Sequence, residues 1–292
     1  MMALGLTRFV RFLKEKNWSV PVLTYHSLNV TENTYSGNDH VAFESDLRTI
    51  DRLGLKIIPL SMLVDGLKRR IPPGDLKKCV AITIDDGSWL DYHDIEHPTC
   101  GLQRGFFNIL KDFQTSDAGA RQKSLHMTSF VIVSPRARLE LDRKCLIGKG
   151  WWGDDWWPEA DSSGLMAVEC HSWDHVHDAL DQVSQKDNVK GDFRQVNSYQ
   201  DCSAQVTGAA EYLEQVISRR PSFFAYPWGE ASSYMIEEFM PVHQGRHRFE
   251  AAFSIDARPV TPQENIWNLP RFVCGRDWKS PDELAAVLEQ SS

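Results

Sequence analysis

The stretch CVAITIDDG, residues 79–87, is the part of the sequence that decides the fold class. Its apolar and β-branched residues follow one another almost without interruption, as in a strand of a parallel sheet that helices cover on both faces. Two adjacent acids and a glycine then end the run, a composition that favours the turn from a strand into a loop. The stretch therefore predicts a buried parallel strand with Asp85 and Asp86 at its carboxyl end.

Similar runs recur along the chain and alternate with helical patterns. The other β-rich runs are VPVLTYHSL (20–28), LKIIPL (55–60), MTSFVIVS (127–134), GLMAVECHS (164–172), SFFAYPWG (222–229), FEAAFSI (249–255) and WNLPRFVCG (267–275). Apolar residues at helical spacing lie between them, in residues 43–54, 105–114, 202–220 and 280–290. The alternation predicts an α/β fold, and about seven or eight such units fit a single (β/α) barrel better than an open sheet.

The chain shows no internal repeat and no low-complexity linker that would divide it. We therefore expect one domain over residues 1–292, with residues 1–19 as an N-terminal extension and a core of about residues 20–290. Six cysteines lie at positions 79, 100, 145, 170, 202 and 274 without a CxxC pair. In a chain of this length they are expected to be mostly free thiols of a reducing compartment.

Composition and charge limit the partners and the compartment. A formal net charge of −8 argues against a nucleic-acid-binding protein, which normally has a basic face. No run reaches the roughly 18–20 apolar residues that a membrane span needs, so no integral membrane segment is expected. The stretch MMALGLTRFVRFLKEKNWSV at the start has only a short apolar part, which Arg8 and Arg11 interrupt. No signal peptide is expected there, and a cytoplasmic protein is predicted.

In a (β/α) barrel the active site lies at the carboxyl ends of the strands. The polar residues that end the apolar runs are therefore the candidate site residues. They are Tyr25, His26 and Ser27, Asp85 and Asp86, His171 and His175, Tyr226 and Trp228, and Arg271.

Two of these groups contain residues typical of a metal site. Successive side chains of a strand point to opposite sides, so one acid of Asp85-Asp86 can bind a cation while the other faces a reacting water. His171 and His175 have the spacing of the zincin HExxH motif, although a serine replaces its glutamate and a strand precedes it. Two imidazoles and one carboxylate would complete a three-ligand metal site. Taken singly, the motifs also fit an Asp-Gly surface turn and a solvated histidine pair.

With both motifs in this order, the sequence resembles the polysaccharide deacetylases of the NodB-homology class, carbohydrate esterase family 4. Their first motif, TFDDG, corresponds to TIDDG at residues 83–87, and their second, H-[S/T]-x-x-H, corresponds to HSWDH at residues 171–175. FAYPWGE (224–230) is similar to their third motif. The resemblance covers roughly residues 20–290 and implies a distorted NodB-like barrel.

The resemblance implies a role for each matched residue. Asp85 would be the general base, and the backbone N–H of Trp228, beside Tyr226, would stabilise the oxyanion and contact the substrate. The ligands of a divalent ion would be Asp86, His171 and His175. Zinc is the expected ion, with cobalt, nickel and iron(II) as alternatives. The implied reaction removes an N-acetyl or O-acetyl group from a sugar or glycan, in bacterial surface-polysaccharide biosynthesis.

This chain departs from the family pattern at two places. Phe224-Ala225 stands where an arginine often begins the third motif, and Arg271 stands near the place of a Leu-x-His histidine that protonates the leaving amine. Arginine stays protonated, so Arg271 would orient Asp85 or bind an anionic part of the substrate instead of acting as the acid. His26 is the first choice for the acid, and a metal-bound water with Asp85 acting twice is the second. Alternatively, His26 is an ordinary histidine of the core or of the surface and has no catalytic role.

Two further stretches have more than one interpretation. WWGDDWWPEAD (151–161) places four tryptophans around acids, which suits stacking on the apolar faces of sugars but also a small satellite core or a dimer contact. His93 and His97, in DYHDIEHPTC (91–100), would line the substrate pocket or offer another ligand, and most of that loop is expected to be solvated. His177 is also expected to be solvated.

Three functions are consistent with the sequence. The first is a metal-dependent deacetylase acting on an N-acetylated carbohydrate. The second is a catalytically impaired carbohydrate-binding homologue, because the family's arginine and histidine are missing from their usual places. The third is a related metal-dependent amidohydrolase. Metal content distinguishes the carbohydrate-binding homologue from the two enzymes. A panel of substrates distinguishes the amidohydrolase from the deacetylase. No oligomeric state is predicted.

Overall fold

A parallel sheet lies at the centre of the computed structural model, which describes residues 18–184 and 190–291. The sheet has the continuous strand order β10-β1-β3-β6-β7-β8-β9, with β2 paired to β3, and a separate antiparallel hairpin is formed by β4 and β5. The strands are β1 (Val22–His26), β2 (Lys56–Ile57), β3 (Cys79–Asp86), β4 (Ile95–His97), β5 (Gly101–Gln103), β6 (Met127–Val131), β7 (Met166–Cys170), β8 (Phe223–Ala225), β9 (Ala251–Phe253) and β10 (Phe272–Val273). Every β-rich run of the sequence contains one of the strands of the large sheet.

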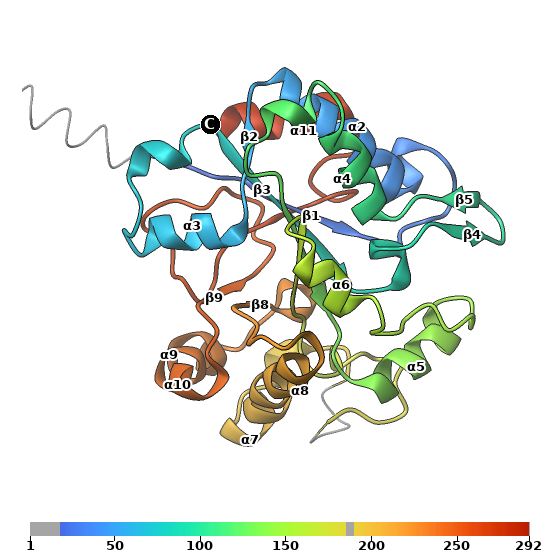
Figure 1. Ribbon diagram of the computed structural model, residues 1–292. Helices are drawn as coiled ribbons and strands as arrows, with labels where there is room; N and C mark the ends of the chain where they lie inside the picture. Colours follow the sequence, from blue (N-terminus) through green and yellow to red (C-terminus); the bar gives the residue numbers. More distant parts are fainter. Residues whose placement is uncertain (1–17, 185–189, 292) are drawn as a thin grey trace, which may run out of the picture.

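Helices surround this sheet (Figure 1). They are α2 (Asp39–Arg52), α3 (Leu60–Leu67), α4 (Phe106–Gln114), α5 (Pro135–Cys145), α6 (Trp157–Ser162), α7 (Tyr199–Cys202), α8 (Gly208–Ile217), α9 (Met240–Val242), α10 (Gln244–His247) and α11 (Pro281–Gln290). The C-terminal helix α11 packs against α2, so the end of the chain covers an early part of it. The helical patterns predicted for residues 43–54, 105–114, 202–220 and 280–290 are confirmed, whereas α3, α5, α6, α9, α10 and most of α7 were not predicted.

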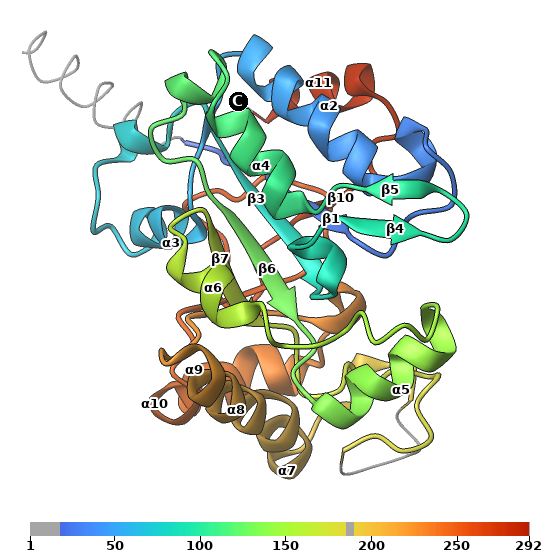
Figure 2. The ribbon, with the colours of Figure 1, turned by 45° about the vertical axis from the view of Figure 1, so that its right-hand side comes forward.

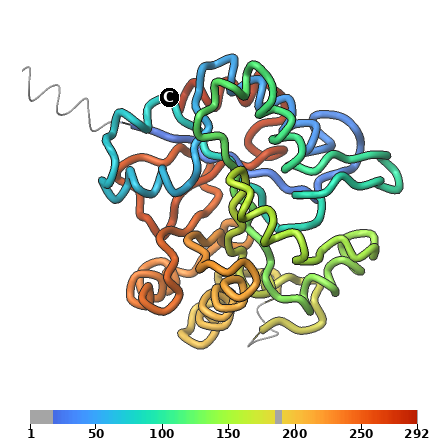
Figure 3. The backbone as a smooth tube through the Cα atoms, viewed as in Figure 1, coloured from blue at the N-terminus to red at the C-terminus, as the bar shows by residue number. Residues whose placement is uncertain are grey.

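The last strand brings the two ends of the sheet together. β10 pairs in parallel with β1, and Leu269, just before β10, forms a parallel bridge with Phe253 of β9. Figure 3 shows this C-terminal part of the chain, in red, beside the first strand, in blue. The (β/α) barrel that the alternation of strands and helices predicts is therefore confirmed.

The residues of β3 explain why it lies inside the barrel. The strand is buried along its length except at its last residue. Val80, Ile82 and Ile84 belong to one large core cluster, whereas Cys79 and Ala81 belong to a second cluster that contains residues of other strands and of α3. Because side chains alternate along a strand, Asp85 points to the same inner side as Ala81. The sequence pattern thus places this carboxylate in the barrel interior.

The tryptophan-rich stretch of residues 151–157 is part of the core. Trp152, Trp156 and Trp157 are buried and pack in the same cluster as β3 and the helices, while Trp151 is half-buried. Of the two interpretations of this stretch, packing in a core fits these three side chains, which have no exposed face for a sugar. The six cysteines are all free thiols, and no helix of the described ranges is long and apolar enough to span a membrane.

Asp46 of α2 is a fully buried carboxylate that links elements distant in sequence. It accepts hydrogen bonds from the hydroxyls of Tyr25 and Tyr35, at 2.9 and 2.5 Å, and from the indole N–H of Trp278, at 3.1 Å. The donors come from β1, from the loop that follows it and from the segment before α11. Burial raises the pKa of Asp46 to about 7, although the three hydrogen bonds oppose the shift.

Replacing Asp46 by alanine is expected to lower the free energy of unfolding by about 3 kcal/mol or more, because each buried donor left without an acceptor costs about 1–3 kcal/mol. Urea unfolding followed by circular dichroism measures the change. Asp51→Ala is the matched control on the same helix, since its ion pair with Arg121 lies at the surface and contributes about 1 kcal/mol or less. Equal losses in the two variants would contradict the role of Asp46.

The raised pKa of Asp46 also predicts the sign of a pH dependence. The native protein keeps this proton up to about pH 7, whereas the unfolded chain releases it near the ordinary pKa of about 4. The contribution of Asp46 to stability is therefore fully present below about pH 4 and decreases as the pH rises to about 7. The difference in unfolding free energy between wild type and Asp46→Ala should be larger at pH 5 than at pH 8. A difference that grows with pH would refute this assignment.

Candidate metal centre and active site

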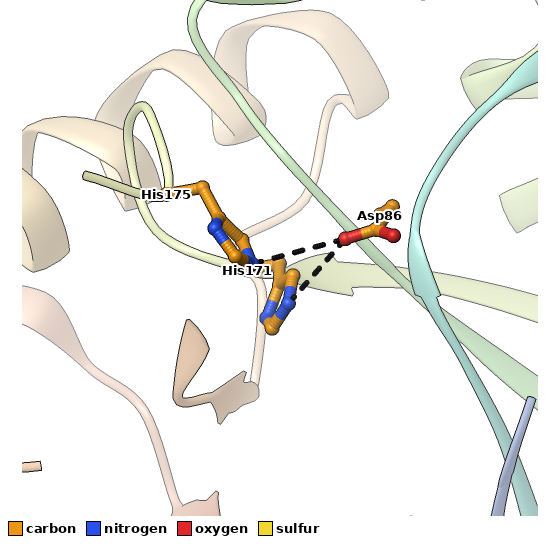
Figure 4. Close-up of side chains that lie close together, drawn as sticks. All are labelled: Asp86, His171 and His175. Atoms are coloured by element: carbon orange, nitrogen blue, oxygen red, sulfur yellow. Dashed lines mark ion pairs between the residues drawn. The ribbon is translucent and has the colours of Figure 1, made fainter. Parts of the chain in front are cut away.

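Three predicted ligands meet at the carboxyl ends of two strands. Asp86 ends β3, and His171 and His175 lie in the loop that follows β7. The Nε2 atoms of His171 and His175 are 3.8 and 3.9 Å from Oδ1 of Asp86, and one ligand atom from each residue lies within 4.8 Å of the others. Figure 4 shows both imidazoles directed toward this carboxylate. Within the described ranges, no other group of histidine, cysteine and acidic side chains is gathered in this way.

The backbone at both strand ends adopts a conformation that places these side chains. Asp86 and Gly87 have φ values of 80° and 76°, so the chain turns sharply as it leaves β3. A Cβ at position 87 would lie 2.8 Å from the Cα of Val131, which explains the glycine of the DDG motif. In the histidine loop, His175 also has a positive φ of 63°, and its N–H donates to Oγ of Ser172 at 2.9 Å. Ser172 thus holds the loop in the conformation that brings His175 to the cluster.

The protonation states of the two histidines suit metal binding. Nδ1 of His171 lies 2.8 Å from the carbonyl oxygen of Ala225, and this contact requires the proton on Nδ1 and leaves the lone pair on Nε2. Burial lowers the pKa of His171, although the nearby Asp85 and Asp86 oppose the shift. Burial also lowers the pKa of His175 well below its usual range. Both imidazoles are therefore neutral at neutral pH, the form that binds a metal.

The separation of each imidazole nitrogen from the carboxylate of Asp86 fits a divalent ion. Ligands of zinc lie about 2.0–2.2 Å from the ion, so two of them are at most about 4.4 Å apart. The distances of 3.8 and 3.9 Å between the imidazoles and Asp86 fall inside this limit. Nδ1 of His175 is buried and has no hydrogen-bond partner, so its ring is held by packing, with the ring of Trp228 at 4.4 Å. Two imidazole nitrogens and one carboxylate oxygen are also the donor set of catalytic zinc sites.

Asp85 is held by a buried arginine from the other end of the chain. Nη1 and Nη2 of Arg271 donate to Oδ1 and Oδ2 of Asp85 at 2.7 and 2.8 Å, and neither residue is appreciably exposed. Two further N–H groups of Arg271 donate to the carbonyl oxygen of Ser254 and the hydroxyl of Thr83. Burial by itself raises the pKa of Asp85, but the charge and hydrogen bonds of Arg271, together with the nearby His171, outweigh it and hold this pKa below its usual range. The carboxylate is therefore ionised, with its Oδ2 at 4.0 Å from Nε2 of His171.

The other predicted site residues lie at different distances from the cluster. His26 pairs in register with Asp85, and its Nδ1 is buried without a hydrogen-bond partner. Trp228 contacts His175 from the turn after β8 and has a left-handed φ of 54°. Tyr226, in contrast, is fully buried, and its hydroxyl donates to the carbonyl oxygen of Trp267 at 2.7 Å. Its side chain thus packs in the core and has no surface to offer a substrate.

Two neighbours of the cluster were not identified from the sequence. The carboxyl of Asp91 is fully buried, accepts a hydrogen bond from Ser129 at 2.6 Å and has a pKa that burial raises to about 7. The indole N–H of Trp152 donates to the carbonyl oxygen of Asp86 at 3.1 Å and so supports the turn after β3. The sequence contains an acid shortly after the DDG motif, but nothing in the motif indicates that β6 would bury it.

The remaining histidines of interest lie outside the cluster. His177 is half-buried, and its Nδ1 accepts the N–H of Ala179 at 3.1 Å. His97 belongs to β4, and its Nδ1 accepts N–H groups of the turn that joins β4 to β5. His93 packs its ring against Trp89. None of these imidazoles belongs to the group of ligand atoms around Asp86.

The sequence matches no protein-family model and no curated protein, but its fold has counterparts among solved structures. The deacetylase PplD of Streptococcus pyogenes, solved in complex with acetate, matches with a TM-score of 0.61 at 17% identity, over 92% of this chain and 98% of that chain. IcaB from Ammonifex degensii matches with 0.61 at 18% identity, over 94% and 98%. A de-N-acetylase from Aggregatibacter actinomycetemcomitans matches with 0.58 at 13% identity, over 91% and 99%. The chain therefore has the NodB-like fold of the polysaccharide deacetylases, as the resemblance of its motifs implied.

Removing one ligand should abolish tight metal binding without unfolding the protein. We expect His171→Ala to weaken zinc affinity by more than the roughly 10–100-fold that loss of an outer hydrogen-bond partner typically costs. Competition titration against a chromophoric chelator measures the affinity. His177→Ala is the matched control, because it removes an adjacent imidazole that lies outside the cluster. Equal affinities of His171→Ala and wild type would rule out this metal centre.

Proposed function

We propose that this protein is a metal-dependent hydrolase that removes an N-acetyl group from a sugar or glycan. The observation that carries the proposal is the cluster of Asp86, His171 and His175 beside an ionised, arginine-bound Asp85. The fold supports it, because solved structures that share this fold are described as deacetylases. Removal of an O-acetyl group is the alternative reaction. A role in bacterial surface-polysaccharide biosynthesis, a single domain over residues 1–292 and a cytoplasmic location are parts of the same proposal.

In this proposal Asp86, His171 and His175 hold the ion, and zinc is the first candidate because of the donor set. When bound, a divalent ion polarises the carbonyl of the acetamide and lowers the pKa of a water molecule. The low pKa values of the two histidines keep their nitrogens free for this purpose at neutral pH. Cobalt, nickel and iron(II) are alternatives with similar ligand preferences.

Asp85 accepts the proton of the attacking water. The water oxygen adds to the acetamide carbon, the carbon–nitrogen bond then breaks, and acetate and the free amine leave. Arg271 occupies one lone pair on each oxygen of Asp85, and a second lone pair on each oxygen still accepts a proton. The bidentate contact fixes the plane of the carboxylate, which orients the base toward its proton. Arg271 therefore positions the base and takes no part in proton transfer.

His26 is proposed as the acid that protonates the leaving amine. It lies level with Asp85 on the neighbouring strand, and its backbone N–H is fixed by the carboxylate of Asp39 at 2.8 Å. Trp228 is proposed to offer its backbone N–H to the oxyanion, since it lies against His175 at the turn after β8. Tyr226 is given no part in this proposal, because its hydroxyl is already bonded in the core.

Acetate release from a panel of N-acetylated sugar nucleotides and oligosaccharides tests the function. We expect release by the metal-loaded protein and its loss after treatment with a chelator, with recovery when zinc is restored. Asp85→Asn should retain the metal but release acetate at least about 10²-fold more slowly, because an amide cannot accept the proton. If the wild type binds glycans but releases no acetate from any of them, the carbohydrate-binding alternative replaces the proposal.

The Asp85→Asn variant needs a control for folding, because it leaves the buried Arg271 without a counter-charge. The double variant Asp85→Asn/Arg271→Met removes both charges and keeps similar side-chain volumes. The double variant should be more thermally stable than Asp85→Asn, and it should release acetate as slowly as Asp85→Asn does. An active double variant would exclude Asp85 as the base.

The role of His26 is tested by His26→Gln. General-acid loss typically costs about 10²–10⁴-fold in rate, so acetate release should fall within this range. The pH profile of kcat/KM should also lose the alkaline limb that reports an essential acid. His93→Gln is the control, because His93 follows β3 in a neighbouring loop outside the cluster. An unchanged alkaline limb in His26→Gln would assign the acid to another group.

A further inference from the structure

The segment between α5 and α6, residues 146–156, contacts the loop that carries the ligand Asp86, although it contributes no atom to the group of ligand atoms. The indole N–H of the buried Trp152 donates to the carbonyl oxygen of Asp86 at 3.1 Å. The carbonyl oxygen of Trp151 accepts the N–H of Trp89, which follows the DDG motif, at 2.7 Å. Figure 2 shows the segment as the long connection from α5, at the lower right, to α6, near the centre.

Two buried side chains of α5 fix the same segment from its other side. Asp142 accepts the N–H groups of Gly150 and Trp151 at 2.9 and 3.0 Å. Nη1 of Arg138 donates to the carbonyl oxygen of Trp152 at 2.8 Å. Arg138 and Asp142 are only 3% and 2% exposed, so these contacts are shielded from water. Trp152 is therefore held by α5 at its carbonyl oxygen, while its indole holds the ligand loop.

The backbone of Asp86 is the part of the metal centre that needs this support. Its φ of 80° is a conformation that a residue with a side chain rarely adopts, so surrounding contacts must hold it. Its carbonyl oxygen accepts two hydrogen bonds, from the N–H of Ile132 and from the indole of Trp152, both at 3.1 Å. Without the indole donor, we expect Asp86 to relax and its Oδ1 to leave its position 3.8 Å from Nε2 of His171.

We propose that Trp152 is a positioning residue of the metal centre, and that Arg138 acts on the metal site through it. The proposal rests on the proposed function, because it requires a divalent ion at the cluster of ligand atoms. Groups that orient metal ligands are commonly bonded to the ligating side chain, whereas Trp152 bonds to the backbone of its ligand. Metal affinity then depends on a segment that supplies no ligand, and this gives the tryptophan-rich stretch a role beyond core packing.

Trp152→Phe removes the indole N–H and keeps an aromatic ring in the core. Its zinc affinity, measured by competition with a chromophoric chelator, should fall about 10–100-fold, the typical effect of losing an outer hydrogen bond at a metal site. Trp156→Phe is the matched control, because Trp156 is buried in the same segment and its Nε1 has no hydrogen-bond partner. It should lose thermal stability as a core substitution does and bind zinc as tightly as the wild type.

The visible absorption spectrum of the cobalt(II)-loaded protein tests the geometry of the ligands. Because this spectrum depends on how the ligands are arranged, it should change in Trp152→Phe and stay as in the wild type in Trp156→Phe. A loss of stability alone does not rearrange the ligands of the folded protein. Equal zinc affinities and equal cobalt spectra of the two variants would overturn the proposal.

Arg138→Met tests whether the arginine acts through Trp152. The single variant should weaken zinc binding, and the double variant Arg138→Met/Trp152→Phe should lose less than the product of the two single losses, since coupled residues are not additive. Losses that multiply would refute the role given to Arg138. A wild type that binds neither zinc nor cobalt(II) would refute the metal centre, and with it both the proposed function and the role of Trp152. A wild type that binds zinc but releases no acetate would refute the function alone.

Discussion

The buried pair of Arg271 and Asp85 is the interaction on which the rest of this structure depends. Removing two charges from water costs several kcal/mol for each ion, and the cost is offset only when geometry and hydrogen bonding are complete. Here both carboxylate oxygens are bonded, and two further N–H groups of Arg271 donate to Ser254 and Thr83. Arg271 adjoins β10, which pairs with β1, and Asp85 is the penultimate residue of β3, on the other side of β1. One contact thus locks the last strand into the barrel and keeps the proposed base ionised.

Most of the fold could be predicted from the sequence, because buried parallel strands have continuous apolar runs that helical patterns separate. The β4–β5 hairpin escaped prediction, since its short strands, residues 95–97 and 101–103, bury few side chains and show no alternation. Helix α5 was not predicted for a related reason. Its residues are mostly charged, and only a few of them face the core. The tryptophans of residues 151–157 had two interpretations, because burial of an aromatic ring depends on neighbours that composition does not specify.

The candidate site was predictable where a motif places residues at strand ends. Asp86, His171 and His175 do meet, because β3 and β7 run in the same direction and are separated by β6 alone. Contacts between residues far apart in sequence were harder to predict. The sequence suggested two roles for Arg271, which were to orient Asp85 or to bind an anionic part of the substrate. Only the arrangement of the last strand shows that Arg271 reaches Asp85. Asp91 was missed because its burial depends on Ser129 of β6, and Tyr226 was misplaced because its hydroxyl finds a partner in Trp267.

The pairing of Arg271 with Asp85 also has a consequence for how the protein forms during its synthesis. The two residues are 186 positions apart, so most of the chain leaves the ribosome before the carboxylate can meet its counter-ion. Until then, Asp85 ends an apolar strand that has no cation to bury it against, and β1 lacks its partner β10. Contacts of such long range form slowly, because a large loop must close first. The proposed base can therefore acquire its native environment only after the chain has been synthesised as far as Arg271, just before β10.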